Sequence, residues 1–223
     1  MLSAIRWIVF DAVGTLIFPD PPVAEVYFAA GLRCGSRLTA DEIRSRFRAA
    51  LAAAYSSCRP TSEPLERMRW QQIVSTVFDD VPDSHGELFE QLWQHFADPQ
   101  YWRLFDDVAP VLSQLHRRGH RLGIASNFDG RLRHIVAGHP PLAACQPIFV
   151  SSEVGFTKPD PRFFATVTRQ LAAEPAEILL IGDDETADVT AARAAGWQAR
   201  LLCRNKSTLH EDALSSLCQL LDS

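Results

Sequence analysis

The chain has 223 residues, of which 47% are hydrophobic, and a formal net charge of −5, as is typical of a globular protein with room for one domain and a smaller insert. Its arginines are dispersed among acidic residues, which argues against a nucleic-acid surface, and no apolar run approaches the ~20 residues of a membrane span. Five widely spaced cysteines without a CxxC pair indicate neither a disulfide framework nor a zinc site. We therefore expect a cytoplasmic monomer or homodimer with a small-molecule partner.

The first predicted element is a buried strand over Trp7–Phe10, a short apolar run that ends on Asp11. The chain then turns through Gly14 to Thr15. A carboxylate at the tip of such a strand lies where open α/β sheets hold their reactive groups, although Asp and Gly are also ordinary turn residues. Asp11 is therefore a candidate reactive residue that needs support from the rest of the chain.

Residues 18–105 are expected to be helical and to contain no strand. The run Phe18-Pro-Asp-Pro-Pro22 breaks regular structure and marks a domain boundary. Two of the predicted helices begin with a capping box, in which a Ser or Thr hydroxyl and a Glu carboxylate each satisfy a free backbone N–H. The four helices are predicted at 23–32, at 39–55 from the Thr39/Glu42 box, at 65–78, and from the Ser84/Glu87 box through Phe96.

Beyond residue 106, helices alternate with short apolar runs. Strands are predicted at 121–125, 147–150, 178–181 and 198–203, and helices at 107–118, 160–172, 186–195 and 209–221. Together with Trp7–Phe10 this gives five strands alternating with helices, which indicates a parallel sheet covered on both faces. The expected fold class is therefore α/β, a Rossmann-like core of residues 1–17 and 106–223 with an inserted α-helical cap of residues 18–105.

Polar residues that a core does not need follow three of these strands. The carboxyl ends of parallel strands lie along one edge of a sheet, so residues far apart in sequence can face one crevice. The three groups are Asp11 with Thr15, Ser126 with Asn127, and Asp183 with Asp184 and Asp188.

Lys158, one of only two lysines in the chain, precedes the predicted helix start at Asp160-Pro161 and is placed to reach the same crevice. Several carboxylates in one crevice repel each other, and a cationic side chain or a bound metal is the usual remedy. We expect Lys158 and a hard cation with oxygen ligands, Mg²⁺, to balance this charge.

These stretches, in this order, resemble the haloacid dehalogenase-like superfamily of hydrolases. The resemblance spans essentially the whole chain, and a helical insert just after the first motif is similar to the subclass with an α-helical cap. Ser126-Asn-Phe-Asp129 and Arg69-Trp70 resemble one branch of that subclass. The four motifs are Asp11-Ala-Val-Gly-Thr-Leu16, Ile124-Ala-Ser-Asn-Phe-Asp129, Lys158-Pro-Asp-Pro161 and Gly182-Asp-Asp-Glu-Thr-Ala-Asp188.

The resemblance implies a phosphatase-like hydrolase with a metal site. Asp11 would attack phosphorus to give an aspartyl-phosphate that water then hydrolyses, and covalent catalysis by a carboxylate is an established route. Asp11, the backbone carbonyl of Val13 and Asp183 would hold Mg²⁺. Asp188 would orient metal-bound water.

The resemblance also implies a binding site for the phosphoryl group of a small phosphorylated substrate. Ser126 and the backbone N–H of Asn127 would bind phosphoryl oxygens. Lys158 would neutralise charge between Asp11 and the transferring group, and Thr15 would position the nucleophile loop. In the cap, Arg48, Arg69 and Trp70 are the candidate substrate-binding residues.

Val13 departs from the family's phosphatases, in which the residue two after the nucleophile is usually a second Asp that acts as general acid and base. Such a group contributes ~10²–10⁴ in rate. A cap residue could supply the acid, or the substrate could carry a good leaving group, as acyl and aryl phosphates do. The chain could instead be a metal-independent haloacid dehalogenase, with Arg48 binding the halide, or a binding protein with little turnover. Because those dehalogenases do not normally keep an acidic pair like Asp183-Asp184, Mg²⁺-dependent phosphoryl hydrolysis is our preferred interpretation.

Overall fold

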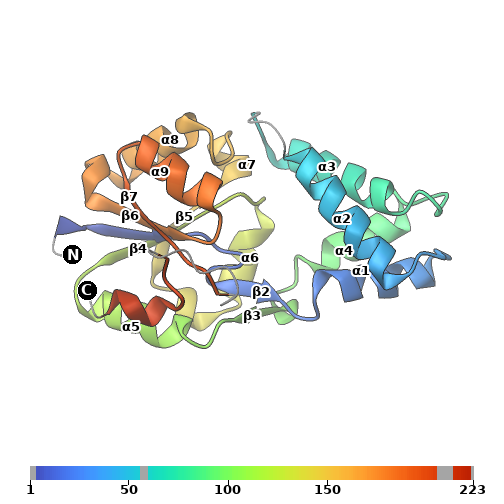
Figure 1. Ribbon diagram of the computed structural model, residues 1–223, viewed down its shortest axis with the longest axis horizontal. Coiled ribbons are helices and arrows are strands. Elements are labelled where there is room, and N and C mark those ends of the chain that lie inside the picture. Colours follow the sequence, from blue (N-terminus) through green and yellow to red (C-terminus); the bar gives the residue numbers. More distant parts are fainter. Residues whose placement is uncertain (1–3, 56–59, 205–212, 222–223) are drawn as a thin grey trace.

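A computed structural model describes residues 4–55, 60–204 and 213–221. At its centre lies a five-stranded parallel sheet in the order β5-β4-β1-β6-β7, which confirms the expected Rossmann-like α/β class. The strands run toward a group of helices at the other end of the molecule, so their carboxyl ends face it (Figure 1). The strands are β1 (Trp7–Phe10), β4 (Arg121–Ser126), β5 (Cys145–Val150), β6 (Ile178–Gly182) and β7 (Gln198–Leu201).

The central strand β1 is buried on both faces because its side chains alternate between two hydrophobic clusters. Ile8 and Phe10 pack into one cluster with residues of α5 and α6, whereas Trp7 and Val9 pack into the other with residues of α8 and α9. Figure 1 shows α5 on one side of the sheet and α8 and α9 on the other. The helices of this part are α5 (Val108–Arg117), α6 (Arg131–Ala137), α7 (Ser151–Val154), α8 (Pro161–Leu171) and α9 (Ala191–Ala194).

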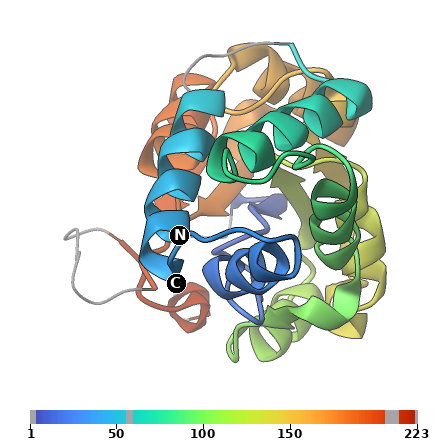
Figure 2. The ribbon, with the colours of Figure 1, turned by 90° about the vertical axis from the view of Figure 1, so that its right-hand side faces the viewer.

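Among the described residues, four α-helices between β2 and β3 form a separate group with a hydrophobic cluster of their own. We call α1 (Val23–Arg33), α2 (Ala40–Ala54), α3 (Glu63–Val77) and α4 (Glu87–His95) the four-helix group. It lies beyond the carboxyl ends of the strands, and Figure 2 views it with the sheet behind. None of the helices in the described part of the chain has the length and apolar character needed to cross a membrane.

A short antiparallel ribbon joins the four-helix group to the sheet. β2 (Ile17–Pro19) pairs with β3 (Trp102–Leu104), so the expectations of broken structure at Phe18 and of no strand within residues 18–105 were wrong. Each strand has three residues and forms only because its partner returns from far along the chain, which no local pattern indicates.

A second connection fixes the other side of the four-helix group. Glu63, at the start of α3, accepts hydrogen bonds from the Gly130 backbone N–H (2.8 Å) and from the Ser152 hydroxyl. The Thr61 N–H donates to the Gly155 carbonyl at 2.9 Å. The group is therefore held over the sheet edge by contacts at two places.

The helix boundaries test the capping rules. The Thr39/Glu42 capping box is confirmed, but the predicted Ser84 box is wrong because α4 begins at Glu87 with Gly86 as its N-cap.

The predicted helix 186–195 is a π-helix (Glu185–Thr190) followed by α9. Of the predicted terminal helix, residues 209–212 lie outside the described residues, and the remainder contains only a 3-10 helix, Leu217–Leu220. Helices α6 and α7 were not expected; other 3-10 helices are Pro99–Tyr101, Pro140–Leu142 and Pro175–Glu177.

Candidate active site

Asp11 lies at the carboxyl end of the central strand and is only 7% exposed. Its backbone N–H donates to the Ile181 carbonyl at 2.8 Å, which extends the pairing of β1 with β6 by one residue. Ser126, the last residue of β4, donates its hydroxyl to Asp11 Oδ1 at 3.1 Å. The parallel sheet thus brings together two residues that are 115 positions apart.

Lys158 is buried and reaches the same carboxylate. Its Nζ donates to Asp11 Oδ1 and to the Ala125 carbonyl, both at 2.8 Å, and also to Asp188 Oδ1. Burial disfavours the ammonium form, but the two carboxylates outweigh it and hold the pKa of Lys158 above its ordinary value. The ammonium ion is therefore a fixed positive charge beside Asp11.

Asn127 holds the Lys158 backbone in place. The Asn127 side-chain amide donates to the Lys158 carbonyl at 2.8 Å and accepts from the Lys158 N–H at 2.7 Å. Both bonds engage the side chain and do not involve the backbone N–H of Asn127, the group to which the resemblance assigns phosphoryl binding.

Two glycines let the acidic residues approach each other. Gly14 has φ +84°, and a side chain there would overlap with the Asp183 carboxylate; a side chain at Gly182 would overlap with that of Asp188. Without these Cβ atoms, Asp11, Asp183 and Asp188 each place a carboxylate oxygen within 4.8 Å of the others.

The close carboxylates change each other's titration. Burial, opposed mainly by Lys158, raises the pKa of Asp11 to about 6. Asp183 keeps accessible surface, but partial burial of its carboxyl group, followed by the charges of Asp11 and Asp188, raises its pKa to about 7. Three carboxylates share one lysine here, and an all-oxygen cluster with excess negative charge is a donor set that fits Mg²⁺.

The remaining predicted residues lie around this cluster. Thr15 is fully buried and its hydroxyl donates to Asp183 Oδ1 at 3.5 Å. Val13 is half-buried, with its side chain against the core and along a cavity wall. Asp184 accepts from the N–H groups of Thr186 and Ala187 and so caps the π-helix.

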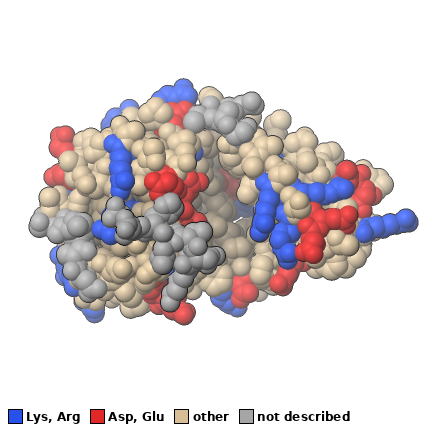
Figure 3. Space-filling view, viewed as in Figure 1, with Lys and Arg blue, Asp and Glu red and all other residues tan. Residues whose placement is uncertain are grey.

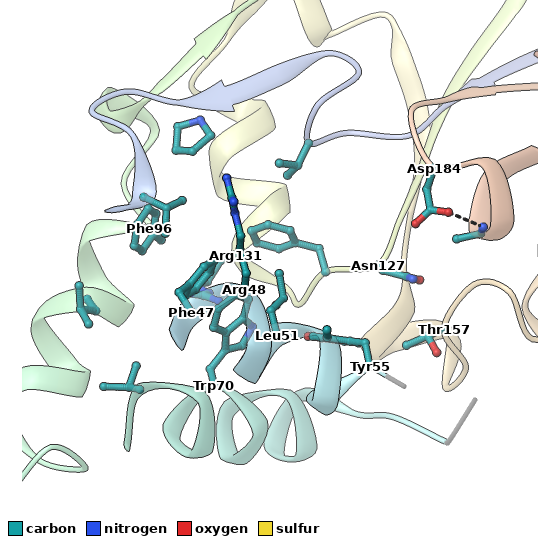
Figure 4. A pocket seen from close by; sticks show the side chains of 18 of the residues that line it. Phe47, Arg48, Leu51, Tyr55, Trp70, Phe96, Asn127, Arg131, Thr157 and Asp184 are labelled. Carbon is teal, nitrogen blue, oxygen red and sulfur yellow. Dashed lines mark hydrogen bonds between the residues drawn. The ribbon is translucent and has the colours of Figure 1, made fainter. Parts of the chain in front are cut away.

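A cavity of about 770 Å³ opens between the sheet edge and the four-helix group, and the space-filling view is hollowed there (Figure 3). Val13, Asn127 and Lys158 line it on the sheet side. The opposite wall is mostly apolar and aromatic (Figure 4). Its residues from the helices include Tyr27, Phe47, Arg48, Leu51, Tyr55, Trp70, Phe89, Trp93 and Phe96.

The three predicted cap residues differ in their placement. Arg48 and Trp70 line the cavity. Arg69 is not among the described residues that line it: its guanidinium pairs with the buried Glu66 and lies 4.8 Å from the centre of the Tyr55 ring. Among the described residues, Arg69 thus contacts Tyr55, which lines the cavity, without lining the cavity itself.

The sequence interpretation missed Arg131, a basic residue of the cavity wall. Its guanidinium lies 3.4 Å from the centre of the Trp93 ring and makes two 2.7 Å hydrogen bonds with the buried Asp129. In the sequence, the one feature that distinguishes Arg131 from the many other arginines is its position two residues after the Ser126–Asp129 stretch.

The parallel sheet, the strand-end carboxylates and the buried lysine together define a haloacid dehalogenase-like hydrolase. Residues 5–196 match the family model described as haloacid dehalogenase-like hydrolase, and the chain belongs to this family. Among known relatives, the mouse haloacid dehalogenase-like hydrolase domain-containing protein 3 is 28% identical over 97% of this chain and 92% of its own length. This confirms the branch indicated by Ser126–Asp129 and Arg69-Trp70.

Two solved structures show how widely this fold is used. A HAD phosphatase from Thermococcus onnurineus has a TM-score of 0.71 at 22% identity, covering 98% of this chain and 97% of that one. An L-2-haloacid dehalogenase from Xanthobacter autotrophicus, with chloropropionic acid covalently bound, has a TM-score of 0.70 at 20% identity, covering 91% and 79%. The same fold serves both proteins, so the activity has to be argued from the site.

Proposed function

We propose that this protein is a Mg²⁺-dependent hydrolase of a small phosphorylated molecule, with Asp11 as the nucleophile. The observation that carries the proposal is the buried Asp11 carboxylate, which is bound by Ser126 and Lys158 and lies beside two further carboxylates. A carboxylate held in this way has a defined direction of attack. The adjacent cavity has room for a substrate of drug-like size.

In this proposal each residue of the cluster has one task. Asp11 attacks phosphorus, and hydrolysis of the aspartyl-phosphate restores its carboxylate. Ser126 and the Asn127 N–H bind phosphoryl oxygens, while Lys158 stabilises the negative charge of the transferring group. Thr15, through Asp183, fixes the turn behind the nucleophile.

The metal would be held by Asp11, Asp183 and the backbone carbonyl of Val13, with Asp188 orienting its water ligands. When bound, Mg²⁺ supplies charge neutralisation for the phosphoryl group and the carboxylates. We assign residues 1–17 and 106–223 to the hydrolase core. Residues 18–105 form a cap that excludes water from the cavity and selects the substrate through Arg48 and Trp70.

The test is hydrolysis of acetyl phosphate and p-nitrophenyl phosphate by the purified protein. Phosphate release should require Mg²⁺, stop with EDTA and resume when Mg²⁺ is restored. It should also be lost in Asp11→Asn, which keeps the shape of the side chain without its nucleophilic charge. Phosphate release that continues in this variant, or in EDTA, would overturn the assignment.

A second candidate is metal-independent dehalogenation, favoured by two observations. Val13 provides no acid, which a halide leaving group does not need, and Arg48 lies in the cavity wall where a halide could bind. Chloride release from 2-chloropropionate in the presence of EDTA would support this activity over phosphoryl hydrolysis. Absence of both activities in the folded protein would support a binding or regulatory role.

A further inference from the structure

Arg48 differs from the other basic residues of the cavity wall. Lys158 is bound to Asp11 and Asp188, and Arg131 is bound to Asp129. For Arg48 there is no hydrogen bond or ion pair within the described part of the chain, and its exposed side chain lines the cavity. A guanidinium that lines a cavity and has no counter-ion can bind a carboxylate or phosphate of a ligand through charge-assisted hydrogen bonds.

The wall around Arg48 favours a flat apolar ligand. The Phe47 and Trp70 rings stack at a centroid separation of 6.5 Å and an angle of 23°, and both line the cavity beside Arg48 (Figure 4). Aromatic surfaces of this kind bind planar rings through stacking and burial of apolar area. The cavity therefore offers a ring-binding wall next to a cation.

Val13 restricts the leaving group. It lines the sheet side of the same cavity, and a valine cannot protonate a departing oxygen. An alkoxide leaves poorly without a proton, whereas an aryloxide is a weak enough base to leave as an anion. The absence of an acid at position 13 therefore favours an aromatic leaving group, and the aromatic cavity wall favours the same group.

On the basis of the phosphohydrolase function proposed above, we infer that the substrate is a small aryl phosphate bearing a carboxylate. Its phosphoryl group lies at Asp11, its ring lies against the wall of Phe47 and Trp70, and its carboxylate pairs with Arg48. The phosphoryl group and the carboxylate thus bind at opposite sides of the cavity.

The reaction balances without any oxidant or reductant. An Asp11 carboxylate oxygen forms a bond to phosphorus as the bond from phosphorus to the aryl oxygen breaks, and the aryloxide leaves with the electron pair. Water then attacks phosphorus, and the bond from phosphorus to Asp11 breaks. The products are a phenol, which takes its proton from the added water through solvent, and inorganic phosphate.

The experiment compares 3-carboxyphenyl phosphate with 3-carbamoylphenyl phosphate, which has nearly the same shape but no second charge. With Mg²⁺, kcat/KM of the wild-type protein should be at least about tenfold higher for the carboxylate, since a charge-assisted hydrogen bond distinguishes the two. Arg48→Gln should reduce this ratio to about one. Arg48→Lys keeps the charge and should retain part of the ratio. This variant still tests the inference if the glutamine variant does not fold.

Arg44→Gln is the matched control. Arg44 lies one turn before Arg48 on α2, pairs with Asp41 and is exposed, so the ratio should stay at its wild-type value. Calorimetry with the Asp11→Asn variant gives a readout independent of turnover: it should bind 3-carboxyphenyl phosphate at least about tenfold more tightly than the carboxamide, and adding Arg48→Gln should remove the difference.

Equal kcat/KM for the two compounds in the wild-type protein would overturn the inference, as would a ratio that survives Arg48→Gln. If acetyl phosphate is hydrolysed but neither aryl ester is, the phosphohydrolase function stands and the aryl carboxylate substrate is wrong. If none of the three is hydrolysed, both proposals fail.

Discussion

Restoring an acid at position 13 should convert this protein into a good alkyl phosphatase. Val13 and Lys158 both line the cavity, so we expect Val13→Asp to place a carboxyl group within reach of the leaving oxygen. Gaining a general acid and base is worth ~10²–10⁴ in kcat, or about 3–5 kcal/mol of barrier. Because the side chain is half-buried, losing its packing costs about 1 kcal/mol of folding free energy, which a stable domain tolerates.

The assay measures kcat with Mg²⁺ for glycerol 3-phosphate and for p-nitrophenyl phosphate. The gain should appear with the alkyl ester and stay within about tenfold for the aryl ester, whose leaving group needs little protonation. Val13→Asn matches the new side chain in size and polarity but carries no acid, so it should show no gain. Unchanged alkyl phosphatase activity in folded, Mg²⁺-binding Val13→Asp would refute the reasoning.

Two further predictions concern the carboxylate cluster. Gly14→Ala should cost ~1–2 kcal/mol of folding free energy through its left-handed backbone and also weaken Mg²⁺ binding, measured by calorimetry, because the new methyl overlaps with the Asp183 carboxylate. Gly35→Ala is the control, because Gly35 has φ +87° but open space around it; this variant should lose folding free energy through its backbone and bind Mg²⁺ as the wild type does. An equal loss of Mg²⁺ binding in the two variants would contradict this account. Burial raises the pKa values of Asp11 to about 6 and Asp183 to about 7, so between about pH 4 and pH 7 the metal-free folded state binds more protons than the unfolded chain. The stability that these protonated carboxyl groups contribute is complete below about pH 4 and is lost as pH rises to 7. Urea unfolding of the wild type and of Asp183→Asn across this pH range measures the effect. As pH rises, the free energy of unfolding of the wild type should fall relative to that of the variant, and Mg²⁺ should restore it. A rise of the wild-type free energy of unfolding relative to the variant would contradict the assignment.

The sequence predicted the core of the fold because its signals are local. The run Trp7–Phe10 is apolar at every position and ends on a carboxylate, so both its burial and its polar tip are readable in the chain. Once five such strands alternate with helices, the rules of parallel sheets place Asp11, Ser126 and Asp183 at one edge.

Part of what the sequence did not predict depends on partners far along the chain, and part on a choice between local arrangements. β2 and β3 are stable only as a pair. The Ser84 box failed because Ser84 lies inside a turn, in which the Gly86 N–H donates to the Asp83 carbonyl, and α4 begins only after it. The roles of arginines were equally hidden, since Arg48, Arg69 and Arg131 look alike in sequence. The carboxylate partners of Arg69 and Arg131 are near in sequence, at Glu66 and Asp129, but acidic residues near an arginine are common in this chain and do not show which pairs form. For Arg48 the described residues supply no such partner.

The most direct test of the account is the mass of the protein quenched in acid while it turns over p-nitrophenyl phosphate with Mg²⁺. We expect the peptide that contains Asp11 to gain the mass of one phosphoryl group, and we expect this gain to be absent in Asp11→Asn and in the wild-type protein treated with EDTA. Steady release of phosphate with the phosphoryl group on another residue, or with Asp11→Asn as active as the wild type, would contradict the central claim that Asp11 is the nucleophile.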